Sequence, residues 1–195
     1  MREDVLITID RAVKELWLYD IFYDCVNRYL PNEDTLKNSF YFHLRRRLGE
    51  RFLEYNNLRI FTEFNSGELK GTGFRADIAI VKTDPAFNGY INACPDNKIV
   101  ALFELKHSTP ERAFDSDIEK TKYYIRDLKI RDCLFYLGFI SDKTYSKKPR
   151  LEARRTNIWA NGKVTVLSLH NVENVEEGFM SHIQSRNRLN ADLDD

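Results

Sequence analysis

The chain has 195 residues and 30 basic against 30 acidic side chains, so its formal net charge is zero. A balanced charge excludes proteins that bind nucleic acid or membrane through a basic field over the whole surface. The hydrophobic content of 43% is typical of one folded domain, and no apolar run is long enough to span a bilayer. Three cysteines without CxxC spacing favour buried thiols in a reducing compartment, so we expect a cytoplasmic protein that contacts no membrane.

Two helices are predicted at the start of the chain. Residues 4–30 place apolar side chains at helical spacing and end before Pro31. We interpret residues 1–30 as a helical extension whose many aromatic side chains suit a homodimer or partner-protein interface. Asn32 is a suitable N-cap for a second helix that runs to about Tyr55, with its apolar stripe at Leu36, Phe40, Leu44 and Leu48.

The rest of the chain alternates strands with one helix. Apolar patterning predicts strands at residues 58–64, 74–81, 99–107 and 133–140. A helix around residues 114–128 precedes the last of these strands. Asn161-Gly162 predicts a hairpin between residues 156–160 and 164–169, and a short helix is predicted near residues 179–183.

Charged residues interrupt two of these otherwise apolar strands. Asp77 breaks the strand at 74–81, and Glu104 and Lys106 stand two apart near the end of 99–107. Residues two apart on a strand share a face, and burying them costs free energy unless a partner shares the site. A structural explanation is an ion pair of Glu104 with Lys106 at a strand end, with Asp77 an edge carboxylate.

With these residues in this order the chain resembles the PD-(D/E)XK nuclease superfamily. The core of that family is α-β-β-β-α-β, with an aspartate on the second strand and Glu-x-Lys on the third. The matching segments are Arg75-Ala76-Asp77, where alanine replaces the proline, and Phe103-Glu104-Leu105-Lys106. The resemblance covers residues 32–140 and implies an α/β fold with a mixed central sheet and a restriction-endonuclease-like core. Residues 141–195, a basic segment, hairpin and tail, would complete a single domain over residues 1–195.

The resemblance implies a hydrolase, a restriction endonuclease-like nuclease that cleaves phosphodiester bonds, with DNA as the favoured substrate. Asp77 and Glu104 would bind Mg²⁺, or Mn²⁺ in its place, because carboxylate oxygens suit such ions. The metal would activate a water and neutralise phosphate oxygens. Lys106 would orient or help deprotonate that water and stabilise the developing charge.

The resemblance also implies two supporting side chains. Family members often carry an acidic residue on the first core helix; Glu33 is the first choice and Glu63 the rival. They also often carry a lysine or glutamine on the helix after Glu-x-Lys, where we choose Lys120 over Lys122. Each has a structural alternative, because a glutamate in a first helical turn is favoured by the helix dipole alone and a lone lysine is usually solvated.

Two basic clusters are candidates for contact with the nucleic-acid backbone, which attracts cations whatever its sequence. They are Arg45, Arg46 and Arg47 in the second helix, and a segment that includes Lys147 and Lys148. The alternative for either is a solvated face. The alternative for the whole protein is a non-catalytic nucleic-acid-binding or protein-interaction subunit of the same fold. Catalysis is favoured because a binder needs no lysine beside two carboxylates.

Overall fold

The computed structural model describes residues 3–65, 69–84, 98–107, 111–128, 130, 133–141, 163–171 and 179–185. Its helices are α1 (Glu3–Glu15), the π-helical turn η1 (Leu16–Ile21), α2 (Phe22–Val26), α3 (Glu33–Leu48), α4 (Glu50–Tyr55) and α5 (Glu111–Arg126). Its strands are β1 (Leu58–Phe64), β2 (Ala76–Lys82), β3 (Lys98–His107), β4 (Leu134–Ser141), β5 (Val164–Asn171) and β6 (Phe179–Ser185).

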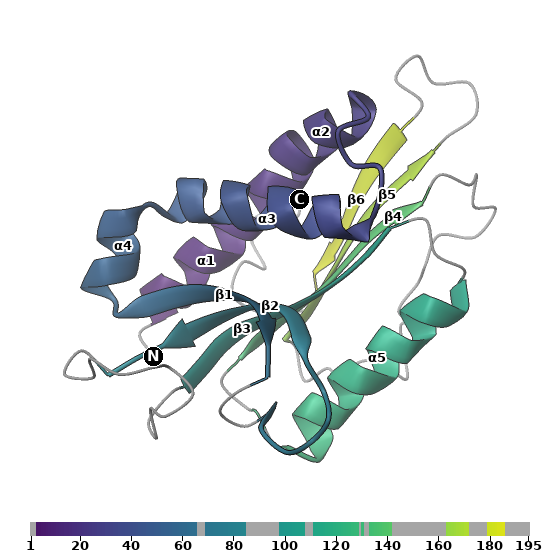
Figure 1. Ribbon diagram of the computed structural model, residues 1–195. Coiled ribbons are helices and arrows are strands. Elements are labelled where there is room, and N and C mark those ends of the chain that lie inside the picture. Colours follow the sequence, from purple (N-terminus) through teal and green to yellow (C-terminus); the bar gives the residue numbers. More distant parts are fainter. Residues whose placement is uncertain are drawn as a thin grey trace.

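The six strands form one mixed sheet in the order of the chain. β1, β2 and β3 are antiparallel neighbours, β3–β4 and β4–β5 are parallel, and β5–β6 is antiparallel. A parallel pair needs a crossover connection, and α5 lies in the crossover from β3 to β4. Figure 1 shows α5 on one face of the sheet and the N-terminal helices on the other. The mixed α/β class that the sequence predicts is therefore confirmed.

The N-terminal helices differ from the prediction at two points. The first helical run ends at Val26 rather than before Pro31, because Arg28 adopts a left-handed backbone with φ of 60°. The second predicted helix is two helices, because Gly49, at φ 75°, breaks the run between α3 and α4. The Asn32 cap is confirmed: its side chain accepts the Thr35 N–H at 3.0 Å, and the Thr35 hydroxyl accepts the Asn32 N–H at 3.2 Å.

Two predictions near the C-terminus are wrong. β5 pairs with β4 along one edge and with β6 along the other, so neither edge is left for the predicted hairpin with residues 156–160, which lie outside the described residues. The helix expected near residues 179–183 is strand β6. Five residues are too few to separate the two periodicities. In the sheet the strand alternates, with Phe179 and Ile183 against the core and Met180 exposed.

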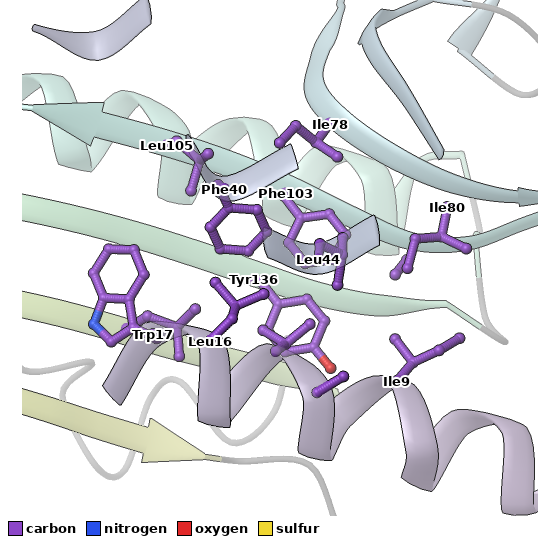
Figure 2. Close-up of a cluster of buried hydrophobic side chains, with 14 of the residues drawn as sticks. Ile9, Leu16, Trp17, Phe40, Leu44, Ile78, Ile80, Phe103, Leu105 and Tyr136 are labelled. Atoms are coloured by element: carbon purple, nitrogen blue, oxygen red, sulfur yellow. The ribbon is translucent and has the colours of Figure 1, made fainter. Parts of the chain in front are cut away.

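Aromatic packing holds β3 in place under the N-terminal helices (Figure 2). Phe103 stacks on Tyr136, with ring centroids 4.8 Å apart and planes 10° apart, and its ring centroid lies 5.2 Å from that of Phe40. Successive side chains on a strand point to opposite faces. Burying Phe103 and Leu105 in this core therefore sends Glu104 to the other face of the sheet.

A close approach between the first helical run and β4 depends on a glycine. Trp17 is fully buried, and a Cβ at Gly138 would lie 3.2 Å from its ring and 2.5 Å from the Leu105 side chain. Leu105 is itself fully buried, so a side chain at position 138 would have to displace it within the packed core. The absence of a side chain at position 138 thus lets Trp17 and Leu105 pack on β4, and it helps to fix the strand that carries Glu104 and Lys106.

The structure bears on the cysteines and on the search for membrane-spanning helices. Cys25 and Cys133 are buried, and Cys94 lies outside the described residues. No helix in the described ranges has the length and apolar character needed to cross a membrane.

Candidate active site

The candidate site lies where β2 begins and β3 ends. The two strands are antiparallel, Ile78 pairs with Phe103, and the next residues along the two strands are Asp77 and Glu104. A cleft of about 720 Å³ opens at this point. All five residues predicted to be catalytic line it. The lining residues are Glu33, Lys37, Asn65, Leu69, Gly71, Gly73, Phe74, Arg75, Asp77, Glu104, Lys106 and Lys120.

Asp77 is held in one orientation by contacts from two elements. It is 8% exposed, and its Oδ2 accepts the backbone N–H of Leu105 at 2.7 Å. Its Oδ1 lies 3.4 Å from the Lys37 Nζ. The bond to Leu105 ties β2 to β3, so the carboxylate stays on the side of the sheet where the cleft opens.

Glu104 is the most deeply buried acidic group that lines the cleft, with 3% of its surface exposed. Its Oε2 accepts from the Lys120 Nζ at 2.7 Å and its Oε1 from the Tyr124 hydroxyl at 3.4 Å. Burial raises the pKa of Glu104 to about 8, and the charge of Asp77 adds to that rise, whereas Lys120 opposes it.

Lys106 stands among acidic side chains rather than in a pair with Glu104. Its Nζ lies 3.2 Å from the Glu33 Oε1 and 3.8 Å from the Asp117 Oδ2. Burial by itself lowers the pKa of Lys106, but the charges of Asp117, Asp77 and Glu33 outweigh burial and raise that pKa above its ordinary value. Lys106 therefore carries a positive charge among these carboxylates.

Helix α5 brings Lys120 into the cleft and leaves Lys122 outside it. The Lys120 Nζ donates to the Arg75 backbone carbonyl at 2.6 Å as well as to Glu104, whereas Lys122 pairs with Glu119 on its own helix. Lys120 therefore ties α5 to Glu104 on β3 and to Arg75, the residue before β2.

Both acidic alternatives of the sequence analysis are near the site. Glu33, in the first turn of α3, lines the cleft and contacts Lys106. Glu63, near the end of β1, contacts Lys37 and Arg75 through its two carboxylate oxygens. Its backbone is left-handed, with φ of 53°. Each therefore has a lysine partner beside the cleft. Their positions alone do not decide which of the two is the supporting acidic residue.

Sequence reasoning missed Lys37, Asp117 and Tyr124. Burial by itself lowers the pKa of Lys37, but the hydrogen bonds and charges of Glu63 and Asp77 raise it by more. The net result is a raised pKa, so the side chain is a protonated cation. Helical spacing places all three on the same helix faces as predicted site residues, but it does not single them out from the other charged residues of those helices. Lys37 follows Glu33 by one turn of α3, and Asp117 and Tyr124 flank Lys120 by one turn of α5 on either side.

The arginine cluster of α3 lies away from the cleft. Arg45 pairs with Glu50, Arg46 and Arg47 both pair with Asp20, and Glu15 also pairs with Arg47. None of the three arginines lines the cleft. Acidic neighbours offset their charge, and contact of Arg45, Arg46 and Arg47 with nucleic acid stays a prediction. Lys147 and Lys148 lie outside the described residues.

The cleft offers carboxylate oxygens, which are the donors that Mg²⁺ prefers. Within the described ranges, no three His, Cys, Asp or Glu side chains gather as a metal-binding group. Mg²⁺ does not need three, because it commonly binds through one or two carboxylates and keeps several waters. Asp77 and Glu104 are two such carboxylates, and the burial of Glu104 beside a like charge is relieved by a cation. Their oxygens are donors of the kind that a hard divalent ion takes.

Comparisons with protein-family models, with curated proteins and with solved structures found no match for this chain. The residues of the site are therefore the basis for assigning its chemistry. Acidic and basic side chains together line a cleft where the antiparallel strands β2 and β3 meet. Such a cleft can bind a cation through its carboxylates and an anion through its lysines.

Proposed function

We propose that the protein is a metal-dependent nuclease of the PD-(D/E)XK type, with a restriction-endonuclease-like core and DNA as its favoured substrate. The proposal depends on one observation: Asp77 and Glu104 lie on adjacent strands and line the same cleft as Lys106. The order of α3, the three antiparallel strands, α5 and the parallel strand β4 supports it.

The carboxylates of Asp77 and Glu104 would hold Mg²⁺ or Mn²⁺. When bound, such an ion lowers the pKa of a coordinated water and neutralises phosphate oxygens. Hydrogen bonds already orient both carboxylates. The Leu105 N–H donates to Asp77, and Lys120 and Tyr124 donate to Glu104. Lys120 is on this basis a positioning residue.

Lys106 would act as a cation toward the phosphate. Hydrolysis of a phosphodiester adds negative charge to the phosphate oxygens in the transition state. The Lys106 pKa is raised, so its ammonium group carries a full positive charge at neutral pH. It would therefore bind a phosphate oxygen and stabilise the added charge. Beside the bound metal ion it would also orient or help deprotonate the attacking water.

The direct test is a cleavage assay on single- and double-stranded DNA and on RNA. Wild type is compared with Asp77→Asn and Lys106→Met, in Mg²⁺, in Mn²⁺ and in EDTA. Lys98→Met is the matched control, because Lys98 lies on the same strand as Lys106 but at its other end. Circular dichroism of each variant shows that it is folded.

We expect cleavage in Mg²⁺ or Mn²⁺ and none in EDTA. Loss of a group that stabilises transition-state charge typically lowers the rate by about 10²- to 10³-fold, which is the fall expected for Lys106→Met. Lys98→Met should keep the wild-type rate. Equal rates in wild type, Asp77→Asn and Lys106→Met, or no cleavage by wild type under any of these conditions, would refute the proposal.

A non-catalytic nucleic-acid-binding or protein-interaction subunit is the second candidate. The observation that favours it is that each acidic side chain of the cleft already has a lysine partner, as in a purely structural ion-pair network. A subunit of this kind would bind DNA with the same affinity in EDTA and in Mg²⁺ and would cleave nothing.

A further inference from the structure

Arg75 is the most exposed cation among the described residues that line the cleft. Its side chain is 62% exposed, whereas the side chains of the lining lysines are between 14% and 19% exposed. These lysines are Lys37, Lys106 and Lys120, and each pairs with carboxylates inside the cleft. A ligand that enters from solvent therefore meets Arg75 before it meets the lysines.

Contacts from two other elements fix Arg75. Its Nε pairs with the Glu63 Oε2 on β1, and its backbone carbonyl accepts from the Lys120 Nζ on α5 at 2.6 Å. Glu63 is itself held, because its other carboxylate oxygen accepts from the Lys37 Nζ at 3.0 Å. Burial raises the pKa of Glu63, but the hydrogen bond from Lys37 and the charges of Lys37 and Arg75 outweigh burial and lower that pKa, so Glu63 keeps its negative charge.

We propose that Arg75 binds a phosphate of the nucleic-acid backbone at the mouth of the cleft, and that Glu63 is the positioning residue that holds its guanidinium group there. This inference rests on the proposed function, because it requires that the cleft receives a nucleic-acid strand. Arg75 contacts a phosphate next to the one that Lys106 binds, and it takes no part in the cleavage step.

The chemistry of the group fits a phosphate. A guanidinium group presents its N–H donors in a planar fork, which matches two phosphate oxygens at once, and an ammonium group cannot do this. An ion pair as exposed as that of Arg75 with Glu63 contributes little in water, so the glutamate orients the arginine and leaves it open to a phosphate. An arginine that is already oriented loses less side-chain freedom when it binds.

The test measures how the full chain binds fluorescein-labelled single- and double-stranded DNA, by fluorescence anisotropy in EDTA over a series of salt concentrations. Arg75→Gln removes the charge, and Arg75→Lys keeps the charge but loses the fork. Arg59→Gln is the matched control, because Arg59 is an exposed arginine on the same strand as Glu63 and does not line the cleft. Inorganic phosphate and a mononucleotide are added as competitors, and circular dichroism shows that each variant is folded.

We expect Arg75→Gln to bind DNA more weakly and to lower the slope of log affinity against log salt by about 0.7 to 0.9, the contribution of one phosphate contact. Arg75→Lys should keep the slope with a reduced affinity, and Arg59→Gln should match wild type. A purely structural ion pair would leave the slope unchanged, so equal slopes and affinities in wild type and Arg75→Gln would overturn the inference. Displacement of the DNA by phosphate or the mononucleotide at concentrations similar to that of the DNA would overturn it as well. If Arg75→Gln does not fold, the affinity of Arg75→Lys decides.

Failure of the proposed function gives a different result. A wild-type protein that binds DNA through Arg75 and cleaves none contradicts the nuclease proposal and leaves the role of Arg75 intact. If the protein cleaves DNA in Mg²⁺, Arg75→Gln should raise KM more than it lowers kcat. Cleavage with the same KM in wild type and Arg75→Gln keeps the nuclease and rejects the inference about Arg75. A wild-type protein that neither binds nor cleaves nucleic acid overturns both.

Discussion

Replacing Glu104 by glutamine should make the stability of the protein less sensitive to rising pH. Glutamine is neutral at every pH and so resembles the protonated form of Glu104. In the folded protein the pKa of Glu104 is raised from 4.5 to about 8, chiefly by burial. The folded state therefore binds this proton more tightly than the unfolded state. Between these two pKa values, wild type loses stability as the pH rises, and Glu104→Gln does not lose this contribution.

The size of the effect follows from the two pKa values. One pKa unit corresponds to 1.36 kcal/mol, so a shift from 4.5 to about 8 corresponds to about 5 kcal/mol between acid and alkaline conditions, as an upper figure. The free energy of unfolding of wild type should fall by up to about 1.4 kcal/mol per pH unit relative to the variant within this window. The variant also weakens the hydrogen bond from Lys120. This loss shifts the difference in the free energy of unfolding by the same amount at every pH.

Urea unfolding at pH 5, 6, 7, 8 and 9, in EDTA to exclude divalent ions, measures this difference. Glu119→Gln is the control, because Glu119 is an exposed carboxylate on the same helix as Lys120 but does not line the cleft. A stability difference between wild type and Glu104→Gln that stays constant from pH 5 to pH 8, or that moves in favour of wild type, would refute the reasoning about the buried carboxylate.

Three further changes test the parts of the fold that support the site. Gly138→Ala should lower the free energy of unfolding by about 1–3 kcal/mol, because the new methyl group meets Leu105 and Trp17; an unchanged urea midpoint would contradict this packing. Asn32→Ala should cost about 1 kcal/mol, since it removes the cap of α3, while Asn32→Ser should retain most of the stability. Tyr136→Phe should cost about 1–3 kcal/mol, because the tyrosine hydroxyl donates to the buried Asp10 carboxylate at 2.9 Å; a thermal melt identical to wild type would argue against that bond.

The strands and helices that carry the site were predictable because their apolar patterns are long and because capping and turn residues mark their ends. The β3 segment is a ten-residue strand with a continuous apolar run, and its charged end is visible in the sequence. The Asn32 cap was predictable because it involves residues only three apart. Short or broken patterns failed: β6 was mistaken for a helix, and the glycine break after α3 was missed because the amphipathic stripe continues across it.

The membership of the cleft was predictable only in part. Asp77, Glu104 and Lys106 stood out because each interrupts or ends an apolar strand. Lys37 and Asp117 did not, because each lies on a helix that is rich in charged residues, where most such side chains are solvated. Their burial depends on how α3 and α5 pack against the ends of the strands. Local sequence does not predict that packing.

Sequence alone determined the residue types of the site and the faces on which they stand. The alternation of a strand sets Glu104 and Lys106 on one side and Leu105 on the other. Tertiary structure decided the pairing of these charges. The structural alternative from sequence was a pair of Glu104 with Lys106. The fold instead pairs Glu104 with Lys120, Lys106 with Glu33 and Asp117, and Asp77 with Lys37. The physical reason is that ion pairs form between groups that packing brings within a few ångströms, and packing joins residues that are far apart in the chain.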